Sequence, residues 1–506
     1  MNKSFAIRFL LAAMMALSVA VTGCSDDNPP EVTGGSGGSG GVGGGGTGGD
    51  GGMGGGGTGG TPVPLSVSAD PAGTTFAAGS TVDVTLEAAG DGSADAIIYY
   101  TTDLSEVEVP TGAGGAGGAG GVGGNDGSGT QVYAGPITIA DTTVLKFVAV
   151  AADDTETSEE LEGYTLTDGV QSEQWAESGH GDIVAEAWRH WDGDGEVEAD
   201  DPDPLEADGC AKCHGGVTEV PLRGFLQFAE TGENADPAPL PLGLDCAACH
   251  SMDTDYPYVL DETDPINAVE FPSGLSAGYG NASNLCMSCH QGRESKVQVD
   301  LEIAASAGPY GFLNIHYFAA AATLFGTQVK GGYEYDTKTY VGQNLFAVHE
   351  ALAAGALTDC LECHMNAATG DDKDHTFMPA VTSCATSGCH SGASFEELSG
   401  SPSSNYTDIQ ALTAELLPLI ETYANDVLSM PIVYSDGYPY WCNDNGNPCN
   451  FANGYQDFDA TLLKAAYNYQ TALKDPGGYI HNGKYIKQIL FDSIEDLGGT
   501  PSVTRP

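Results

Sequence analysis

Residues 360–364 read Cys-Leu-Glu-Cys-His, and the same arrangement of two cysteines and a histidine recurs along the second half of the chain. Three further copies occupy residues 210–214, 246–250 and 286–290. A fifth stretch, residues 384–390, also places a histidine directly after its second cysteine, but four residues separate its two cysteines. Because 10 of the 13 cysteines belong to these stretches, they decide how this part of the 506-residue chain folds.

The Cys-x-x-Cys-His pattern is the attachment motif of c-type haem. Two thiols one turn apart can bond the two vinyl groups of one porphyrin, and the adjacent histidine then lies beneath the iron as its proximal ligand. A zinc site would pair two Cys-x-x-Cys units without a histidine after each, and a thioredoxin-like dithiol would occur once. We therefore expect five covalent haems, attached at Cys210, Cys213, Cys246, Cys249, Cys286, Cys289, Cys360, Cys363, Cys384 and Cys389, with His214, His250, His290, His364 and His390 as proximal ligands.

The six other histidines are candidates for the distal side of each iron, and His190 is the candidate spare. If every iron binds two histidines, none keeps an open position for substrate, which favours electron transfer over catalysis. Methionine is the alternative axial ligand, with Met365, Met378 and Met430 available. We expect His316 to stand at the start of a buried helix. The distal candidates are His180, His190, His316, His349, His375 and His481.

Two of these histidines stand in strings similar to those of multihaem cytochromes. Residues 175–180 match a Trp-x-x-Ser-x-His string that supplies distal ligands there, and His481-Asn482 resembles a segment that opens a C-terminal helix. Residues 170–506 as a whole resemble bacterial multihaem c-type cytochrome lipoproteins, including those of extracellular electron transfer. The resemblance implies an electron carrier more than an enzyme. It implies closely packed haems that serve redox partner proteins of the envelope, or a metal oxide or other extracellular acceptor.

Two alternatives to an electron carrier remain. One is a multihaem reductase of a small oxyanion, of the nitrite or tetrathionate type, and the other is a subunit of a cytochrome filament or surface complex.

Besides Cys24, two cysteines lie outside the haem motifs. Cys442 and Cys449 flank a turn-rich segment, and an oxidising compartment favours a disulfide between them. Two polar segments, residues 192–196 and 443–447, carry oxygen side chains of the kind that calcium binds. Since the acidic segment lacks a full ligand loop, Ca²⁺ is only a secondary candidate cofactor.

The N-terminal residues 1–23 have a basic start, a short apolar stretch and small residues before Cys24. They resemble a bacterial lipoprotein signal, which implies that Cys24 is lipidated and becomes the mature N-terminus. We expect an exported protein, held only by this anchor at the periplasmic face or the outer surface of the outer membrane. Residues 24–62 are rich in glycine and are expected to form a flexible linker.

Alternating apolar and polar residues between positions 63 and 168 predict a small antiparallel β-sandwich. Pro71-Ala72-Gly73, the stretch from Tyr99 to Asp103 and the stretch from Thr143 to Ala149 resemble the immunoglobulin-like module of the C-terminal region of chitobiases. A glycine-rich insertion lengthens one hairpin loop. We see no catalytic cluster in this module and expect it to act as a spacer or in adhesion.

The expected fold class is multidomain: this sandwich, followed by a mostly α-helical and irregular multihaem domain with little sheet. The haem sites fall within residues 169–400, and residues 401–506 form a helical C-terminal part with the disulfide loop. Helix-period apolar residues predict helices over residues 407–430 and 458–497. The chain carries 70 acidic and 16 basic residues, a net charge of −54 that disfavours nucleic acid and favours cationic partners or oxidised metal acceptors.

Overall fold

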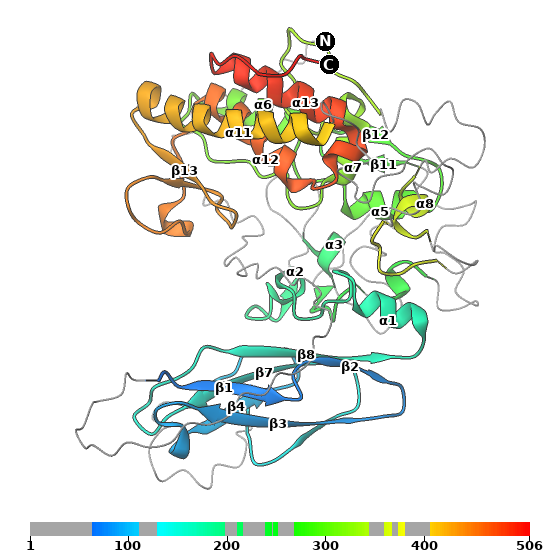
Figure 1. Cartoon of the computed structure of the whole chain (residues 1–506), viewed down its shortest axis with the longest axis vertical. Coiled ribbons are helices and arrows are strands. Elements are labelled where there is room, and N and C mark those ends of the chain that lie inside the picture. Colours follow the sequence, from blue (N-terminus) through cyan, green and yellow to red (C-terminus); the bar gives the residue numbers. More distant parts are fainter. Residues whose placement is uncertain are drawn as a thin grey trace, which may run out of the picture.

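The computed structural model describes residues 63–110, 129–197, 210–215, 238–244, 246–250, 268–343, 359–366, 373–379 and 405–506. Figure 1 shows a β-domain at one end, a helical body at the other, and the cysteine motifs in the middle part between them. The expected fold class is therefore confirmed. The predicted signal peptide and linker, together with Cys24, His349, Cys384, Cys389 and His390, lie outside the described residues.

The β-domain consists of two sheets packed face to face. One sheet has the strand order β1-β3-β6 and the other β2-β8-β7-β4-β5. β2 runs parallel to β8, so the sandwich is mixed and not purely antiparallel as predicted. The physical reason is that the chain leaves the first sheet after β1 and enters the second alongside β8 in the same direction. The strands are β1 (Ser66–Asp70), β2 (Thr74–Ala77), β3 (Val82–Ala89), β4 (Ile97–Thr101), β5 (Gln131–Val132), β6 (Ile137–Ile139), β7 (Thr143–Val150) and β8 (Glu160–Thr167).

Both faces of β7 are covered, which ties the β-domain to the middle part. Leu145 and Phe147 face the opposite sheet, while the Lys146 side chain, 2% exposed, lies 2.8 Å from the carboxylate of Asp192. Lys146 also donates to the carbonyl of Leu104 at 2.9 Å. Removing one partner of a buried ion pair leaves a charge uncompensated in a low dielectric, so this contact fixes the β-domain on the segment that follows it.

The middle part has only short elements in the described residues. Ser295 caps α6 by accepting from the amide of Val297 at 3.0 Å. The elements are α1 (Val170–Ala176), α2 (Glu186–Arg189), β9 (Glu196–Val197), α3 (Ala211–His214), β10 (Ala238–Pro239), η2 (Cys246–Ala248), β11 (Val269–Glu270), β12 (Ser276–Ala277), α5 (Ser283–Cys289), α6 (Lys296–Ala305), α7 (Ala320–Phe325), η3 (Gly326–Gln328) and α8 (Cys360–His364).

The helical body packs α11, α12 and α13 against one another around a large apolar core. Asp459 caps α12 by accepting from the amide of Leu462 at 2.8 Å. The two predicted helical regions are confirmed, with a break between α12 and α13. Cys442 and Cys449 form a disulfide with sulfur atoms 1.97 Å apart. The elements are α11 (Asn405–Tyr423), η4 (Ala424–Leu428, a π-helical turn), β13 (Ile432–Tyr434), β14 (Trp441–Asn443), η5 (Phe451–Asn453), α12 (Ala460–Lys474) and α13 (Gly478–Asp496).

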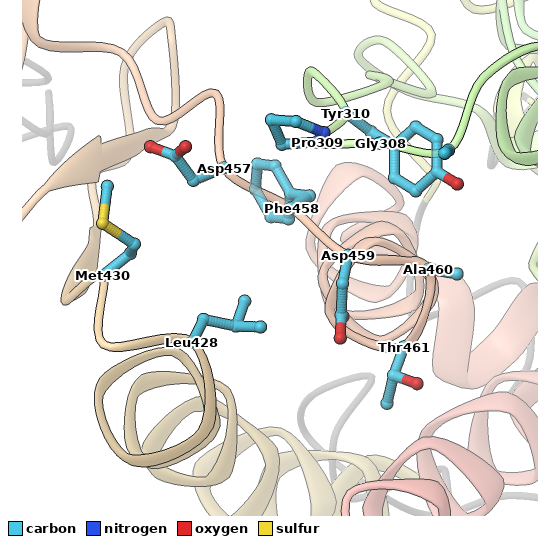
Figure 2. Close-up of a pocket in the computed structure, with 11 residues that line it drawn as sticks. Gly308, Pro309, Tyr310, Leu428, Met430, Asp457, Phe458, Asp459, Ala460 and Thr461 are labelled. Atoms are coloured by element: carbon cyan, nitrogen blue, oxygen red, sulfur yellow. The ribbon is translucent and has the colours of Figure 1, made fainter.

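A surface pocket of the helical body opens between the end of η4 and the start of α12 (Figure 2). Met430, Tyr310 and Phe458 are among the residues around it, and its described lining contains neither cysteine nor histidine. The pocket therefore does not belong to the motif region. Among the described helices, we find none with the length and apolar character needed to cross a membrane.

Candidate functional site

Each described cysteine motif folds as about one turn of helix. The amide of the motif histidine donates to the carbonyl of the first cysteine, at 3.0 Å for His214, 2.9 Å for His250 and 3.0 Å for His290. At the fourth motif, Asp359 caps α8 by accepting from the amide of Glu362 at 3.0 Å. One turn brings two thiols and one imidazole together, as attachment to a single porphyrin requires.

The described motif cysteines occur in two states in the structure. Cys210 is disulfide-bonded. A sulfur atom cannot hold both a disulfide and a thioether, so the structure and the predicted haem bond differ at this position, and the thioether at Cys210 stays a prediction. The reduced thiols are Cys213, Cys246, Cys249, Cys286, Cys289, Cys360 and Cys363.

The structure places each of the four described motif histidines next to one histidine from elsewhere in the chain, with angles between the ring planes from 29° to 86°. All eight side chains are half-buried. The ring centroids of the pairs are 6.1 Å apart for His214 with His316, for His290 with His180 and for His250 with His375, and 6.2 Å apart for His364 with His481.

This separation fits a metal ion between the two rings. Two metal–nitrogen bonds of about 2.0–2.1 Å, with ~1.1 Å from each nitrogen to its ring centre, place trans imidazole centroids roughly 6.3 Å apart. Aromatic rings in direct contact can have centroids as close as about 4.5 Å. All four histidine pairs instead have centroids 6.1–6.2 Å apart, close to the separation expected for two imidazoles that bind one haem iron from opposite sides.

The hydrogen bonds of the motif histidines support the same fit. The Nδ1 of His214 lies 2.9 Å from the carbonyl oxygen of Ala187, that of His290 lies 3.0 Å from Phe318, and that of His364 lies 2.8 Å from Phe377. Since a carbonyl only accepts, each Nδ1 carries the proton, and the Nε2 lone pair is left for a metal.

Two loops of the middle part each serve more than one pair. Residues 316–318 supply both His316, which faces His214, and the carbonyl of Phe318 that orients His290. His316 has a φ of +73° and precedes α7. The expectation that it starts a helix is therefore wrong, because this left-handed backbone turns the chain before the helix begins.

The second of these loops, residues 373–379, supplies His375 and the carbonyl of Phe377 that orients His364. The ring of Phe377 also lies 4.6 Å from that of His180 and 6.0 Å from that of His375. Phe377 therefore contacts one histidine in each of three pairs, so these three pairs have a lining residue in common.

Burial keeps most of these imidazoles neutral. It lowers the pKa of His180 and of His214 to about 4, and it also lowers the pKa values of His290, His316 and His364. A histidine binds a metal through a deprotonated nitrogen. Neutral rings at physiological pH are therefore ready to act as ligands.

His481 differs from the other histidines because a carboxylate stands behind it. Burial by itself would lower its pKa, but the charge and hydrogen bond of Asp475 raise it above the usual value. Both oxygens of Asp475 lie 2.9 Å from Nδ1 of His481. An alanine at Gly477 would place its Cβ 2.7 Å from the His481 ring, so the glycine allows this close approach.

The remaining candidate ligands lie elsewhere. His190 has its Nδ1 3.1 Å from Glu186 and its ring 4.8 Å from that of Trp191. Met378 is 70% exposed, and Met430 lines the pocket of Figure 2. Met365 is buried directly after the fourth motif.

Sequence reasoning missed several residues that surround the pairs. Trp188 and Trp191 lie 5.6 and 5.3 Å from the ring of His214. At the end of α12, Asp475 contacts His481, and Lys474 lies over the ring of Tyr317, next to His316. In the sequence, Lys474 and Asp475 show only as a charged pair at the end of an apolar helix. Such a pair is also typical of an ordinary helix end and does not by itself indicate a site.

Side chains of the two polar segments have partners within the protein. The carboxylate of Asp192 is used by Lys146 and Arg189. Asn445 donates to Asn453 at 2.8 Å, so the asparagine loop satisfies its own amides. Within the described residues, no group of three or more histidine, cysteine or acidic side chains is placed to hold a metal ion.

Comparison with known proteins relates two parts of the chain to known families. Residues 71–161 match the chitobiase/beta-hexosaminidase C-terminal domain. Over 246 residues the chain is 32% identical to the C-type polyheme cytochrome OmcB of Geobacter sulfurreducens, in strains DL-1 / KN400 and ATCC 51573 / DSM 12127 / PCA. The chain is related to polyheme c-type cytochromes.

The OmcB match covers 42% of this chain and 30% of OmcB. The C-type polyheme cytochrome OmcC of the same species is 27% identical over 385 residues, which are 63% of this chain and 45% of OmcC. The chain thus spans less than half the length of these polyheme relatives. No solved structure matches it. The resemblances to multihaem c-type cytochromes and to the chitobiase C-terminal module are confirmed.

Proposed function

We propose that the chain is a multihaem c-type cytochrome that relays single electrons in the bacterial cell envelope. The observation that carries this proposal is the set of four histidine pairs, each with one motif histidine and a ring separation of 6.1–6.2 Å. The relation to polyheme cytochromes supports it independently.

The chain's residues hold and enclose the cofactor in this proposal. Bound haem supplies an iron that takes up and releases one electron. The motif thiols would form the covalent attachment, and the paired imidazoles would hold the iron from both sides, which would leave no position for substrate at these four sites. The carbonyls of Phe318 and Phe377 keep His290 and His364 in the tautomer that presents Nε2.

Close contacts between motifs support rapid transfer from one site to the next. The thiols of Cys286 and Cys360, from the third and fourth motifs, are direct neighbours. Asn281 before α5 donates to Asp359 before α8 at 2.8 Å. Haems attached at these two motifs would therefore lie close to each other.

The finer parts of the proposal come from the sequence. A fifth haem would attach at Cys384 and Cys389 with His390 as proximal ligand, and His349 is the candidate that remains for its distal side. Lipidation of Cys24 would anchor residues 24–506 to the outer membrane. The net charge of −54 favours cationic redox partners or an oxidised metal acceptor.

Spin state and haem stoichiometry test this function on the full, air-oxidised protein. We expect five haems per chain by haemochromogen assay and only low-spin ferric signals by EPR. A substantial high-spin, ligand-accessible signal would contradict the relay and favour the oxyanion reductase, which needs an iron with one open position.

A further inference from the structure

The end of α12 places two opposite charges beside two different histidine pairs. Lys474 is the last residue of the helix and Asp475 follows it, and their exposed fractions are 6% and 3%. Such buried charges act at short range through a low dielectric, with little screening by salt. Adjacent in sequence, the two side chains contact different neighbours.

Lys474 lies in an aromatic cage beside the pair His214–His316. Its Nζ is 3.2 Å from the ring centroid of Tyr317 and 4.0 Å from that of Tyr440. The hydroxyls of these two tyrosines lie 2.6 Å apart. The ring of Tyr317 in turn lies 5.6 Å from that of His316. Cation–π contacts therefore hold a positive charge close to this pair.

Asp475 is fixed behind the pair His364–His481. Besides its two contacts with Nδ1 of His481, it accepts from the amide of Gly477 at 3.1 Å. A carboxylate that takes up the Nδ1–H bond makes the imidazole a more basic ligand. At His214, His290, His364 and His375 the corresponding Nδ1 lies against a neutral backbone carbonyl.

The pair His290–His180 contacts the surroundings of both sites. Its motif histidine is oriented by Phe318, two residues after His316. The ring of His180 contacts Phe377, whose carbonyl orients His364. The three pairs therefore form a continuous series, with Lys474 beside one end and Asp475 beside the other.

We propose that Lys474 and Asp475 set the direction of this series by raising the reduction potential at His214–His316 and lowering it at His364–His481. This inference rests on the proposed haem function. A nearby cation stabilises ferrous over ferric iron, and a more basic ligand does the reverse. Electrons would therefore collect at the His214–His316 end. Asp475 acts through His481 and is a positioning residue.

Redox titration of the full haem-loaded protein, followed by its visible spectrum, tests the proposal. Asp475→Asn keeps an oxygen acceptor but removes the charge, and we expect the lowest potential to rise. Lys474→Met keeps the length of the side chain, and we expect the highest potential to fall. Each shift should correspond to at least a tenfold change in one reduction equilibrium, which is about 59 mV for one electron.

Matched variants separate charge from structure. Asp475→Glu and Lys474→Arg keep the charges and should restore the wild-type titration. Lys464→Met removes another α12 lysine that lies over an aromatic ring, 5.0 Å from the centroid of Tyr333. Asp408→Asn removes a carboxylate that pairs with Lys487 at 3.0 Å. Both controls should leave every potential unchanged.

EPR gives the second readout, because a less basic His481 alters the signal of one low-spin centre in Asp475→Asn. The proposal is overturned if both charge-removing variants titrate like the wild type, or if the two shift the potentials in the same direction. A wild-type protein without low-spin haem would instead overturn the proposed function, so the two failures are distinguishable.

Discussion

The helical body and the middle part lie next to each other in one chain but are held together by different interactions. In the body, Leu412, Leu416, Ile420, Leu462 and Ile489 are all 0% exposed, so long helices bury a continuous apolar core. In the middle part, α3 has four residues and α8 has five. Helices of that length are not stable by themselves in water.

This difference shows that apolar burial stabilises the fold of the body, whereas the pairing of histidines places candidate ligands. Burial stabilises the body by about 25 cal/mol per Å² of apolar surface removed from water. The middle part instead supplies seven of the eight paired imidazoles, with His481 coming from α13 of the body, and the full stabilisation of these pairs would come with a bound metal. Because Ile315 and Ala322 of the middle part belong to the core of the body, we expect changes in one part to reach the other through this shared core.

The largest expected effect comes from breaking one pair in the middle part. In His180→Ala, the partner of His290 is lost, and we expect one of the low-spin EPR centres per chain to become high-spin. His190→Ala is the matched control, since its ring lies beside Glu186 and Trp191. If His190→Ala gave the high-spin signal and His180→Ala did not, the pairing would be wrong.

A smaller effect is expected where the β-domain meets the middle part. Lys146→Met removes one partner of the buried pair with Asp192, whose side chains are 2% and 5% exposed. We expect a loss of at most about 3–5 kcal/mol in the free energy of unfolding of the β-domain, because the buried carboxylate of Asp192 then keeps only Arg189 as a charged partner. Denaturant unfolding followed by the β-sheet signal in far-UV circular dichroism would measure it, since residues 63–168 contain no tryptophan.

Glu495→Gln is the control for this pair. Glu495 pairs with Lys338, with side chains 42% and 33% exposed, and the variant leaves the contact of Lys338 with the buried Asp492 in place. Pairs this exposed contribute about 0–1 kcal/mol. Equal losses in the two variants would show that the contact between β7 and Asp192 does not fix the β-domain.

The sequence predicted elements of the chain better than the contacts between them. The motif residues and the helices of the body follow from local spacing and periodicity, and both were found. The pairing of His180 with His290 depends on how distant segments meet, which no local pattern encodes. His316 was placed in a helix because apolar residues follow it, but its positive φ is set by the loop that brings it to His214.

The core of the helical body gives the next prediction. Leu416→Ala in α11 leaves a cavity at a fully buried position, and we expect a loss of about 2–5 kcal/mol in the free energy of unfolding of the body. The haem count should not change. Val427→Ala, at a position 60% exposed, should stay within about 0.5 kcal/mol of the wild type. Loss of haem in Leu416→Ala would show that the two parts fold as one unit.

The smallest expected effect is a pH dependence at the edge of the body, where Glu334 is 8% exposed. Burial raises its pKa, although Thr327 and Tyr485 hydrogen-bond to it and Lys330 and Lys296 oppose the shift. A carboxyl whose folded pKa is raised stabilises the protein below its unfolded pKa of about 4.3, and that stability is lost as the pH rises through the folded pKa. Glu334→Gln removes this loss, so we expect its free energy of unfolding to exceed that of the wild type by about 1 kcal/mol or less at pH 7 and to equal it near pH 4.

Glu495→Gln, on the exposed pair with Lys338, is the control and should give the same difference from wild type at both pH values. A Glu334→Gln variant less stable than wild type at pH 7 would show that its two hydrogen bonds outweigh the burial of its charge.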